Sequence, residues 1–249
     1  MLKKHVSNNQ INLLTIVSLV YYFSTKMPEP RKYILLDSAG IRKNAQRTMG
    51  AESFAVFRTV QAAWDSDVIC IVVDGSEPVS HQDQIIAGMA KDYKKGIIII
   101  ANKADLVDTE DKKDFERSFY RKFDFLKIHD FIWVSALNNV NLERVWTTID
   151  EVIDTQEELI DQEQVHKLFN YLMKNKQPTK LRTQRRAVIY DLVYTAKNPH
   201  TFDLLIKNKK SISDNYIKFL ENIIRKQFNL QSSGFKLKIT EVSKKNVLA

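Results

Sequence analysis

The chain has 249 residues, of which 44% are apolar, enough to bury one large hydrophobic core or two modest ones, and we interpret it as two domains. Its single cysteine, Cys70, lies in an apolar run, which excludes a disulfide framework and indicates a structural thiol in a reducing, cytoplasmic setting. Residues 1–161 hold 20 basic and 24 acidic side chains, whereas residues 162–249 hold 18 and 6. The basic C-terminal part indicates an anionic partner, and a nucleic acid is favoured over a membrane. The alternative is a basic surface that serves only solubility.

The N-terminal apolar stretch, residues 11–23, resembles a targeting signal in that Lys3 and Lys4 precede it. It is too short for a spanning helix of about 20 residues, and no small-residue cleavage site follows it. Its β-branched and aromatic side chains, and the polar residues 24–30 that end it, favour a strand, a turn and a second strand over a signal peptide.

From Arg31 onward, short apolar runs alternate with helix-length segments. The runs are residues 33–37, 68–74, 96–101 and 131–135, and they are typical of parallel strands buried on both faces. Apolar side chains recur at helical spacing in residues 57–64 and 140–153. This alternation predicts a doubly wound α/β sheet, whose ligands bind outside the carboxyl ends of the strands.

The first motif at a strand end is Asp37-Ser38-Ala39-Gly40. A carboxylate at Asp37 can hold a hydrated Mg²⁺ ion against nucleotide phosphates, and a glycine at position 40 lets its backbone N–H approach a γ-phosphate. Because D-x-x-G is a short pattern, it fits a simple strand-ending turn as well.

The second motif, Asn102-Lys103-Ala104-Asp105, also follows an apolar strand and is more specific. The Asp105 carboxylate can accept hydrogen bonds from the ring N–H and the exocyclic amine of guanine, a pair of donors that adenine does not present. Asn102 can brace the loop and meet the acceptor edge of the base, and the Lys103 stem can lie across the ring. The motif therefore predicts guanine recognition.

The third motif, Ser135-Ala136-Leu137, follows the apolar strand at residues 131–134. Its small side chains would let a backbone N–H reach the guanine carbonyl. S-A-L has no meaning by itself, but its position after D-x-x-G and N-K-x-D, each on its own strand end, predicts one guanine-nucleotide site.

The three motifs and the residues between them resemble the second GTPase domain of the Der family, the bacterial double-Era-like GTPases. The resemblance rests mainly on two motifs: D-S-A-G-I-R-K, which starts at Asp37, and N-K-A-D-L, which ends at Leu106. Residues 199–202 and 216–222 resemble the KH-like C-terminal domain of the same family. The resemblance covers roughly residues 16–242. It implies a P-loop-NTPase-like, mostly parallel sheet that lacks its first strand and phosphate loop, followed by a small KH-like α/β domain.

The resemblance also implies function. It implies a GTP-binding protein essential for ribosome biogenesis that acts on the rRNA of the large ribosomal subunit, with no membrane or DNA partner. The cofactors it implies are GTP or GDP, Mg²⁺ bound to Asp37 through water, and K⁺ as a charge-stabilising cation. The nucleotide site would include Leu106 and Leu137 besides the polar residues of the motifs.

The sequence departs from the family where the phosphates would bind. G-x-x-x-x-G-K-[ST] is absent, so the chain has no backbone cradle, no lysine for the β- and γ-oxygens and no hydroxyl for Mg²⁺ from such a loop. We therefore expect very weak GTP affinity and negligible turnover from this chain. A truncated or split reading frame and divergence into a pseudo-GTPase are both compatible with this loss.

The domain boundary is expected at the polar, acidic residues 155–165, which divide a GTPase domain, 1–158, from a KH-like domain, 159–249. The second domain should contain helices near 163–174 and 213–228 and strands near 187–194, 201–206 and 235–240. A KH-type G-x-x-G clamp is excluded, since this part has one glycine, Gly234. Basic side chains gather between its first helix and first strand, and we take four of them as candidates for rRNA phosphate contact: Lys180, Arg182, Arg185 and Arg186.

Two function classes remain open from the sequence. One is a Der-like GTPase whose nucleotide state controls docking on ribosomal RNA. The other is a fragment or pseudo-GTPase that binds rRNA or the ribosome without hydrolysing nucleotide. The five histidines are scattered along the chain, so a metal cluster is not expected.

Overall fold

The computed structural model describes residues 10–16, 31–37, 63–79, 84, 87–88, 91–126, 131–178 and 187–242. The chain forms two compact units, Met1–Ile153 and Asp154–Ala249. Most of the helix expected at residues 57–64 lies outside the described residues.

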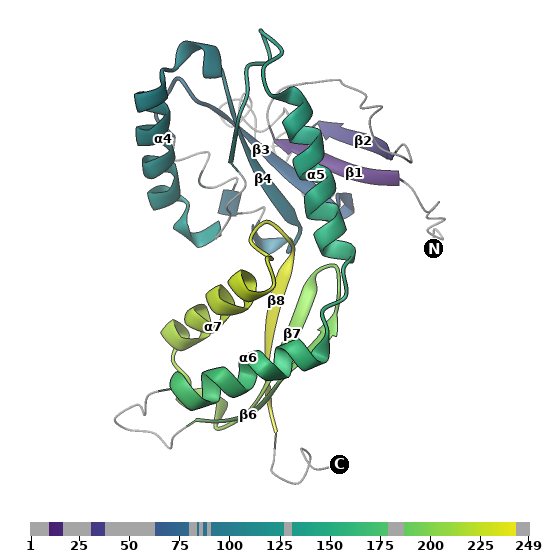
Figure 1. Cartoon of the computed structure of the whole chain (residues 1–249), viewed down its shortest axis with the longest axis vertical. Coiled ribbons are helices and arrows are strands. Elements are labelled where there is room, and N and C mark those ends of the chain that lie inside the picture. The colour runs from purple at the N-terminus through teal and green to yellow at the C-terminus, as the bar shows by residue number, and fades with distance from the viewer. Residues whose placement is uncertain are drawn as a thin grey trace, which may run out of the picture. The chain divides into compact units, whose positions relative to one another are not determined.

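The first unit is built on a five-stranded sheet in the order β2-β1-β3-β4-β5, in which each neighbouring pair is parallel (Figure 1). The strands are β1 (Gln10–Ile16), β2 (Lys32–Asp37), β3 (Val68–Asp74), β4 (Gly96–Asn102) and β5 (Phe131–Trp133). Because all five run the same way, their carboxyl ends meet at one edge of the sheet. The α/β fold with a parallel sheet is confirmed, and the four apolar runs from residue 33 onward are its strands.

β1 occupies an interior position in the sheet, between β2 and β3, that the sequence did not predict. It pairs with β2 on one side, where Leu13 lies opposite Leu35, and with β3 on the other, where Thr15 lies opposite Cys70. The strand expected within residues 11–23 is therefore present. It precedes the D-x-x-G strand, β2, in the sequence and pairs with it in the sheet, whereas the resemblance implied that the first strand is missing. Residues 17–30, including the expected turn, lie outside the described residues.

β3 and β4 are buried on both faces, as their continuous apolar runs predicted, whereas Leu35 of β2 is exposed. On one face Ile69, Ile71 and Ile99 pack with Phe119 and Phe123 from α4 (Thr109–Lys122). This helix begins at Asp108, whose carboxylate accepts from the N–H groups of residues 110 and 111, and it has acidic residues in its first turn and basic ones in its last.

The opposite face of the sheet is covered by α5 (Leu142–Glu157) (Figure 1). Trp146, Ile149 and Val152 of this helix pack on the face that contains Cys70. Burial raises the pKa of the Cys70 thiol to about 12, so the group is a neutral core side chain and not a nucleophile at physiological pH.

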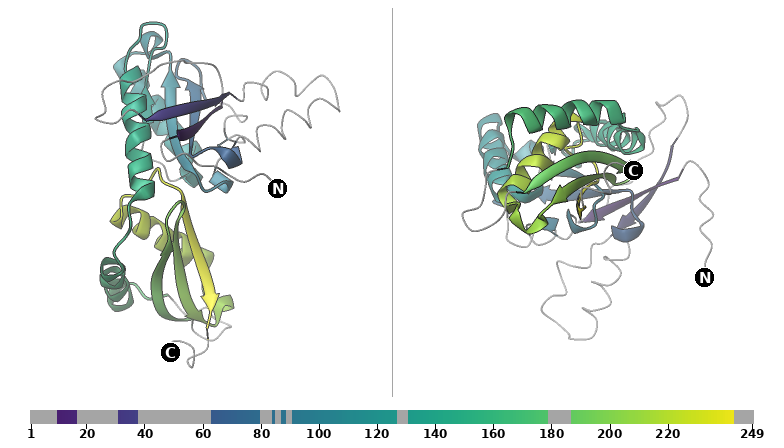
Figure 2. Two further views of the ribbon diagram at one scale, coloured as in Figure 1. Left: turned by 90° about the vertical axis from the view of Figure 1, so that its right-hand side faces the viewer. Right: turned by 90° about the horizontal axis from the view of Figure 1, so that it is seen from below.

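The second unit is a three-stranded sheet covered on one face by two helices (Figure 2). β6 (Val188–Ala196) pairs antiparallel with β7 (His200–Lys207), and β7 pairs parallel with β8 (Phe235–Glu241). The helices are α6 (Gln162–Asn175) and α7 (Asp214–Gln227), with the short η3 (Lys209–Ser211) before α7. The apolar stripes of both helices pack on the sheet.

Arg225, near the end of α7, stabilises the loop that leads to β8. Its guanidinium lies 4.5 Å from the ring centroid of Phe235 and donates to the carbonyl oxygens of Leu230 and Ser233, at 2.9 and 3.3 Å. Burial lowers the pKa of Arg225 to about 10, which leaves it charged at physiological pH. This basic side chain is therefore part of the domain's own core.

The connection between α5 and α6 is shorter than residues 155–165, because α5 continues to Glu157 and α6 begins at Gln162. His200 binds the last turn of α5: its Nε2 lies 2.8 Å from the carbonyl oxygen of Thr155, and its Nδ1 lies 3.0 Å from the hydroxyl of Tyr194. Since an N–H must donate to the carbonyl, Nε2 carries the proton and Nδ1 accepts from the tyrosine. The domain boundary at 158/159 stays a prediction.

Within the described part of the chain, no helix is both long and apolar enough to span a bilayer. The same part contains no group of three or more His, Cys, Asp or Glu side chains that could hold a metal ion.

Candidate guanine-nucleotide site

The three sequence motifs lie at the carboxyl edge of the parallel sheet. Asn102 ends β4, and the following residues form η1 (Ala104–Leu106). Ser135, Ala136 and Leu137 follow β5, which pairs with β4. Asp37 ends β2 at the same edge, whereas Ser38, Ala39 and Gly40 lie outside the described residues.

Two side-chain hydrogen bonds join the N-K-A-D loop to the S-A-L loop. The Oδ1 atom of Asn102 accepts from the N–H of Ala136 at 3.0 Å, and the hydroxyl of Ser135 donates to the Asp105 carboxylate. The Ser135 hydroxyl also accepts from the N–H of Asn138 at 3.2 Å, which closes the turn behind it. Both loops therefore hold one another in place, although they are 30 residues apart in the sequence.

Asp105 lies on the outside of this pair of loops, where it can meet a ligand. The residue is exposed, and one of its carboxylate oxygens accepts from buried Ser135. A carboxylate has about four acceptor positions, so the group can still accept two N–H donors from a flat base. The exposed side chains of Leu106 and Leu137, 66% and 82% accessible, lie on the same two loops and offer apolar surface beside it.

Lys103 has a left-handed backbone, with φ 68° and ψ 34°, which is unusual for a residue with a Cβ atom. Its Nζ lies 2.5 Å from Oδ2 of Asp74, the last residue of the neighbouring strand β3. The hydrogen bond and charge of Asp74 raise the pKa of Lys103. Partial burial acts to raise the pKa of Asp74, but hydrogen bonds from Lys103 and Ser76 outweigh it and lower that pKa, so both groups are ionised at neutral pH.

A second contact from the end of β3 supports the same loop. The N–H of Gly75 donates to the carbonyl oxygen of Asn102 at 2.8 Å, and Trp133 of β5 packs directly over Gly75, where a Cβ atom would lie 2.3 Å from the ring. The indole N–H of Trp133 donates to Glu116 of α4 at 2.7 Å. The ring is thus fixed from behind, and only a glycine fits beneath it.

The sequence contains no phosphate-binding loop of the G-x-x-x-x-G-K-[ST] type for this site. β1 ends at Ile16, at the same edge as Asp37, and a phosphate loop would follow a strand at this place. The sequence after Ile16 reads V-S-L-V-Y-Y-F and contains no glycine. The residues present therefore fit a guanine base, but they do not include the loop that would bind its phosphates.

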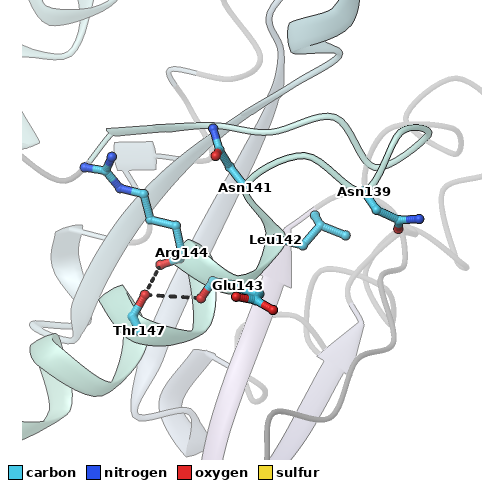
Figure 3. A pocket seen from close by; sticks show the side chains of 6 residues that line it. All are labelled: Asn139, Asn141, Leu142, Glu143, Arg144 and Thr147. Carbon is cyan, nitrogen blue, oxygen red and sulfur yellow. Dashed lines mark hydrogen bonds between the residues drawn. The ribbon is translucent and has the colours of Figure 1, made fainter. Parts of the chain in front are cut away.

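A cavity of about 680 Å³ lies beyond the S-A-L loop, at the start of α5 (Figure 3). The lining residues that the structure describes are polar apart from Leu142, and the hydroxyl of Thr147 donates to the carbonyl oxygens of Glu143 and Arg144 in its own helix, at 3.1 and 3.0 Å. Arg144 and Asn139 extend in opposite directions in Figure 3. The cavity adjoins the candidate site but brings together no group that the motifs require.

The four rRNA candidates, Lys180, Arg182, Arg185 and Arg186, lie outside the described residues. Lys176, just before them, directly follows α6, and its carbonyl oxygen accepts from the hydroxyl of Tyr216 at 2.8 Å. The assignment of these basic residues to RNA contact therefore stays a prediction.

Three supporting residues of the site were not recognised as such in the sequence: Asp74, Gly75 and Trp133. One signal was available, because Asp74 is an acidic residue at the end of an apolar strand, as Asp37 is. Its partner Lys103 is 29 residues away, and only the pairing of β3 with β4, which places Asp74 opposite Asn102, brings the two together.

Family models and a solved structure were found to be similar to this chain. The family model of the elongation factor Tu GTP-binding domain matches residues 15–157, and that of the KH-domain-like C-terminal region of EngA bacterial GTPase enzymes matches residues 160–240. A solved variant of Era from Aquifex aeolicus, bound to GDP and AlF4−, aligns with 96% of this chain and 95% of its own at 16% identity, with a TM-score of 0.47.

Several curated proteins that resemble this chain are named GTPase Der. The protein from Clostridium acetobutylicum is 28% identical over 208 residues, which is 83% of this chain and 47% of the relative. The protein from Geobacillus thermodenitrificans is 30% identical over 212 residues, 84% of this chain and 48% of the relative. The chain spans about half the length of the curated relatives it matches. The chain belongs to the family of elongation factor Tu-type GTP-binding domains, is similar to proteins named GTPase Der, and continues into a part that matches the KH-domain-like model.

Proposed function

We propose that this chain recognises guanine nucleotides through the N-K-A-D and S-A-L loops and serves in ribosome biogenesis as a Der-type protein that contacts the rRNA of the large ribosomal subunit. The observation that carries the nucleotide part is the pair of hydrogen-bonded loops at the carboxyl edge of the sheet, with an exposed Asp105 carboxylate. The proposal includes a cytoplasmic setting.

The base would bind with its ring N–H and exocyclic amine on Asp105, against the two loops. The Lys103 stem, held at its end by Asp74, offers an apolar surface for one face of the ring. Adenine would place an acceptor opposite the Asp105 carboxylate and leave it unpaired, which disfavours that base. Asn102 braces the S-A-L loop through Ala136, so the site is preorganised before a nucleotide arrives.

Nucleotide affinity and turnover would both be low in this chain. GTP or GDP would have the base-recognition residues and Asp37 for a hydrated Mg²⁺ ion, but the sequence supplies no phosphate loop. Charge on the transferring phosphoryl group is stabilised chiefly by such preorganised donors and cations, a role in which we include K⁺ for the complete site. We expect no phosphate release above background when the purified chain is incubated with millimolar GTP; measurable hydrolysis would contradict this expectation.

A second candidate function is RNA or ribosome binding without a nucleotide cycle, as in a pseudo-GTPase. It is favoured by the same lack of a phosphate loop and by the excess of 12 positive charges in residues 162–249. Under this alternative, rRNA affinity would be the same in the presence and absence of GTP or GDP. Under the first candidate, GTP and GDP would change it.

Asp105→Asn tests the base-recognition proposal. An amide in place of the carboxylate cannot accept both guanine donors, but its N–H can donate to the extra carbonyl of xanthine, so we expect GDP affinity to fall at least about tenfold and XDP affinity to rise. Titration with the fluorescent mant derivatives of GDP, XDP and ADP measures all three affinities. Asp114→Asn, an exposed position on α4, is the control. An unchanged preference for guanine in Asp105→Asn would sink this proposal.

A further inference from the structure

Asp74 is placed and oriented as a support for the N-K-A-D loop. Its Oδ1 atom accepts from both the N–H and the hydroxyl of Ser76, at 3.0 and 2.6 Å, which fixes the plane of the carboxylate. The other oxygen, Oδ2, lies 2.5 Å from Nζ of Lys103. The Asp74 side chain is 24% exposed and that of Lys103 is 48% exposed, so the pair lies at the surface, on the same edge of the sheet as Asp105.

The backbone of Lys103 is the part of the loop that most needs support. Its left-handed conformation is disfavoured for a residue with a Cβ atom and persists only where neighbouring contacts determine it. η1, which starts after Lys103, has no side-chain cap at its beginning. The backbone bonds that hold the turn are Ala104 N–H to Val134 and Leu106 N–H to Lys103, at 2.9 and 3.0 Å. The ion pair is the side-chain contact that restrains Lys103 itself.

We propose that Asp74 is a positioning residue for base recognition, which acts through Lys103 to hold the left-handed turn of the N-K-A-D loop and the Lys103 stem in their ligand-ready arrangement. This inference rests on the proposed function and adds to it a residue that would touch no part of the nucleotide. The exposed pair Arg117–Asp114 on α4, at 2.9 Å, has similar chemistry but spans one helical turn and restrains no loop.

The first experiment measures loop order in the full chain without nucleotide. Amide hydrogen exchange at Ala104 and Leu106 is compared among wild type, Asp74→Asn, Lys103→Met, the double variant and the control Asp114→Asn. Surface ion pairs contribute modestly, so we expect Asp74→Asn to speed exchange at these two amides about three- to fivefold while the interior amides of β4 are unchanged. The double variant should match Lys103→Met, because Asp74 has no effect once its partner is gone.

Three exchange results would overturn the inference: wild-type rates in Asp74→Asn, an equal acceleration across β3 and β4, or effects of the two substitutions that add. An equal acceleration would mark a general loss of stability, and additive effects would show that Asp74 acts without Lys103.

The second experiment titrates the same proteins with mant-GDP. We expect Asp74→Asn to lose affinity about three- to fivefold and to keep its preference for guanine, since Asp105 is intact. If wild type binds no guanine nucleotide while loop exchange responds as expected, the proposed function fails and the positioning role of Asp74 in the loop stands. If wild type prefers guanine and Asp74→Asn equals it in both experiments, the positioning role fails and the proposed function stands.

Discussion

Gly75 shows how closely single residues are fitted around the candidate site. Its N–H binds the carbonyl oxygen of Asn102, and the Trp133 ring covers the place where a side chain would begin. We expect Gly75→Ala to lower the free energy of unfolding by about 1–3 kcal/mol, because the new methyl group must displace the indole or the loop. Urea unfolding measures the loss. Gly88→Ala, a helical position where no described atom lies within 4 Å of the new methyl group, should be neutral or slightly stabilising.

At the residue scale, contiguous motifs were readable and contacts across strands were not. Asn102 to Asp105 and Ser135 to Leu137 could be proposed because chemistry at known spacing follows an apolar strand. The ion pair of Lys103 with Asp74 depends on the register of β3 against β4, which the sequence does not state. The hydrogen bond from the Ala136 N–H to Asn102 changes the expected contact with the guanine carbonyl. Because this N–H already has an acceptor, the carbonyl would have to compete for it.

Among the elements, the strands from residue 32 onward were predicted close to their observed ends, whereas the limits of β1 and the last turn of α5 were not. A strand buried on both faces is a continuous apolar run, as β3 shows, so its limits follow from composition. The last turn of α5 is polar and reads as a linker, yet it is helical and accepts a hydrogen bond from His200. Helix ends of this kind are decided by side chains from distant strands, which periodicity does not contain.

The burial of His200 makes the stability of the second unit sensitive to pH. Burial lowers the pKa of His200, although the carbonyl of Thr155 and the charges of Glu157 and Glu158 act in the opposite sense. Its folded-state pKa therefore lies below its unfolded value of about 6.5. The resulting stability is complete above pH 6.5, is lost as the pH falls from there to the folded-state pKa, and changes no further below it.

Urea unfolding of the second unit at several pH values between 8 and 5, monitored by the hydrogen exchange of its core amides, measures this effect. His200→Gln should flatten the profile in that window. A wild-type slope that survives in His200→Gln would assign the pH dependence to other groups.

At the scale of the whole molecule, the chain combines an acidic first part with a basic second part. Residues 1–161 have four more acidic than basic side chains, and residues 162–249 have twelve more basic than acidic ones. Composition alone was sufficient for this division. Composition does not show which basic groups are available to bind a partner. Arg225, for example, donates its hydrogen bonds to the carbonyl oxygens of Leu230 and Ser233 inside its own domain.

The proposed RNA contact follows from this charge division. Neutralising Arg182, Arg185 and Arg186 together, each to Gln, should weaken binding to large-subunit rRNA. Each phosphate contact releases counterions, so the slope of log affinity against log salt should become shallower by about two to three. Filter binding from 50 to 300 mM KCl measures the slope, and duplex DNA of equal length should bind more weakly than the rRNA at every salt concentration.

The matched control removes three exposed charges from the acidic part of the chain, at Lys113, Arg117 and Arg121 of α4. Both triple variants lose the same net charge, so a general electrostatic effect would lower rRNA affinity equally in the two. A local phosphate contact would instead change the salt slope only in the variant of residues 182–186, because counterion release depends on the charges that touch the nucleic acid. If that slope stays at its wild-type value, the RNA contact must be assigned to other basic residues of the second unit.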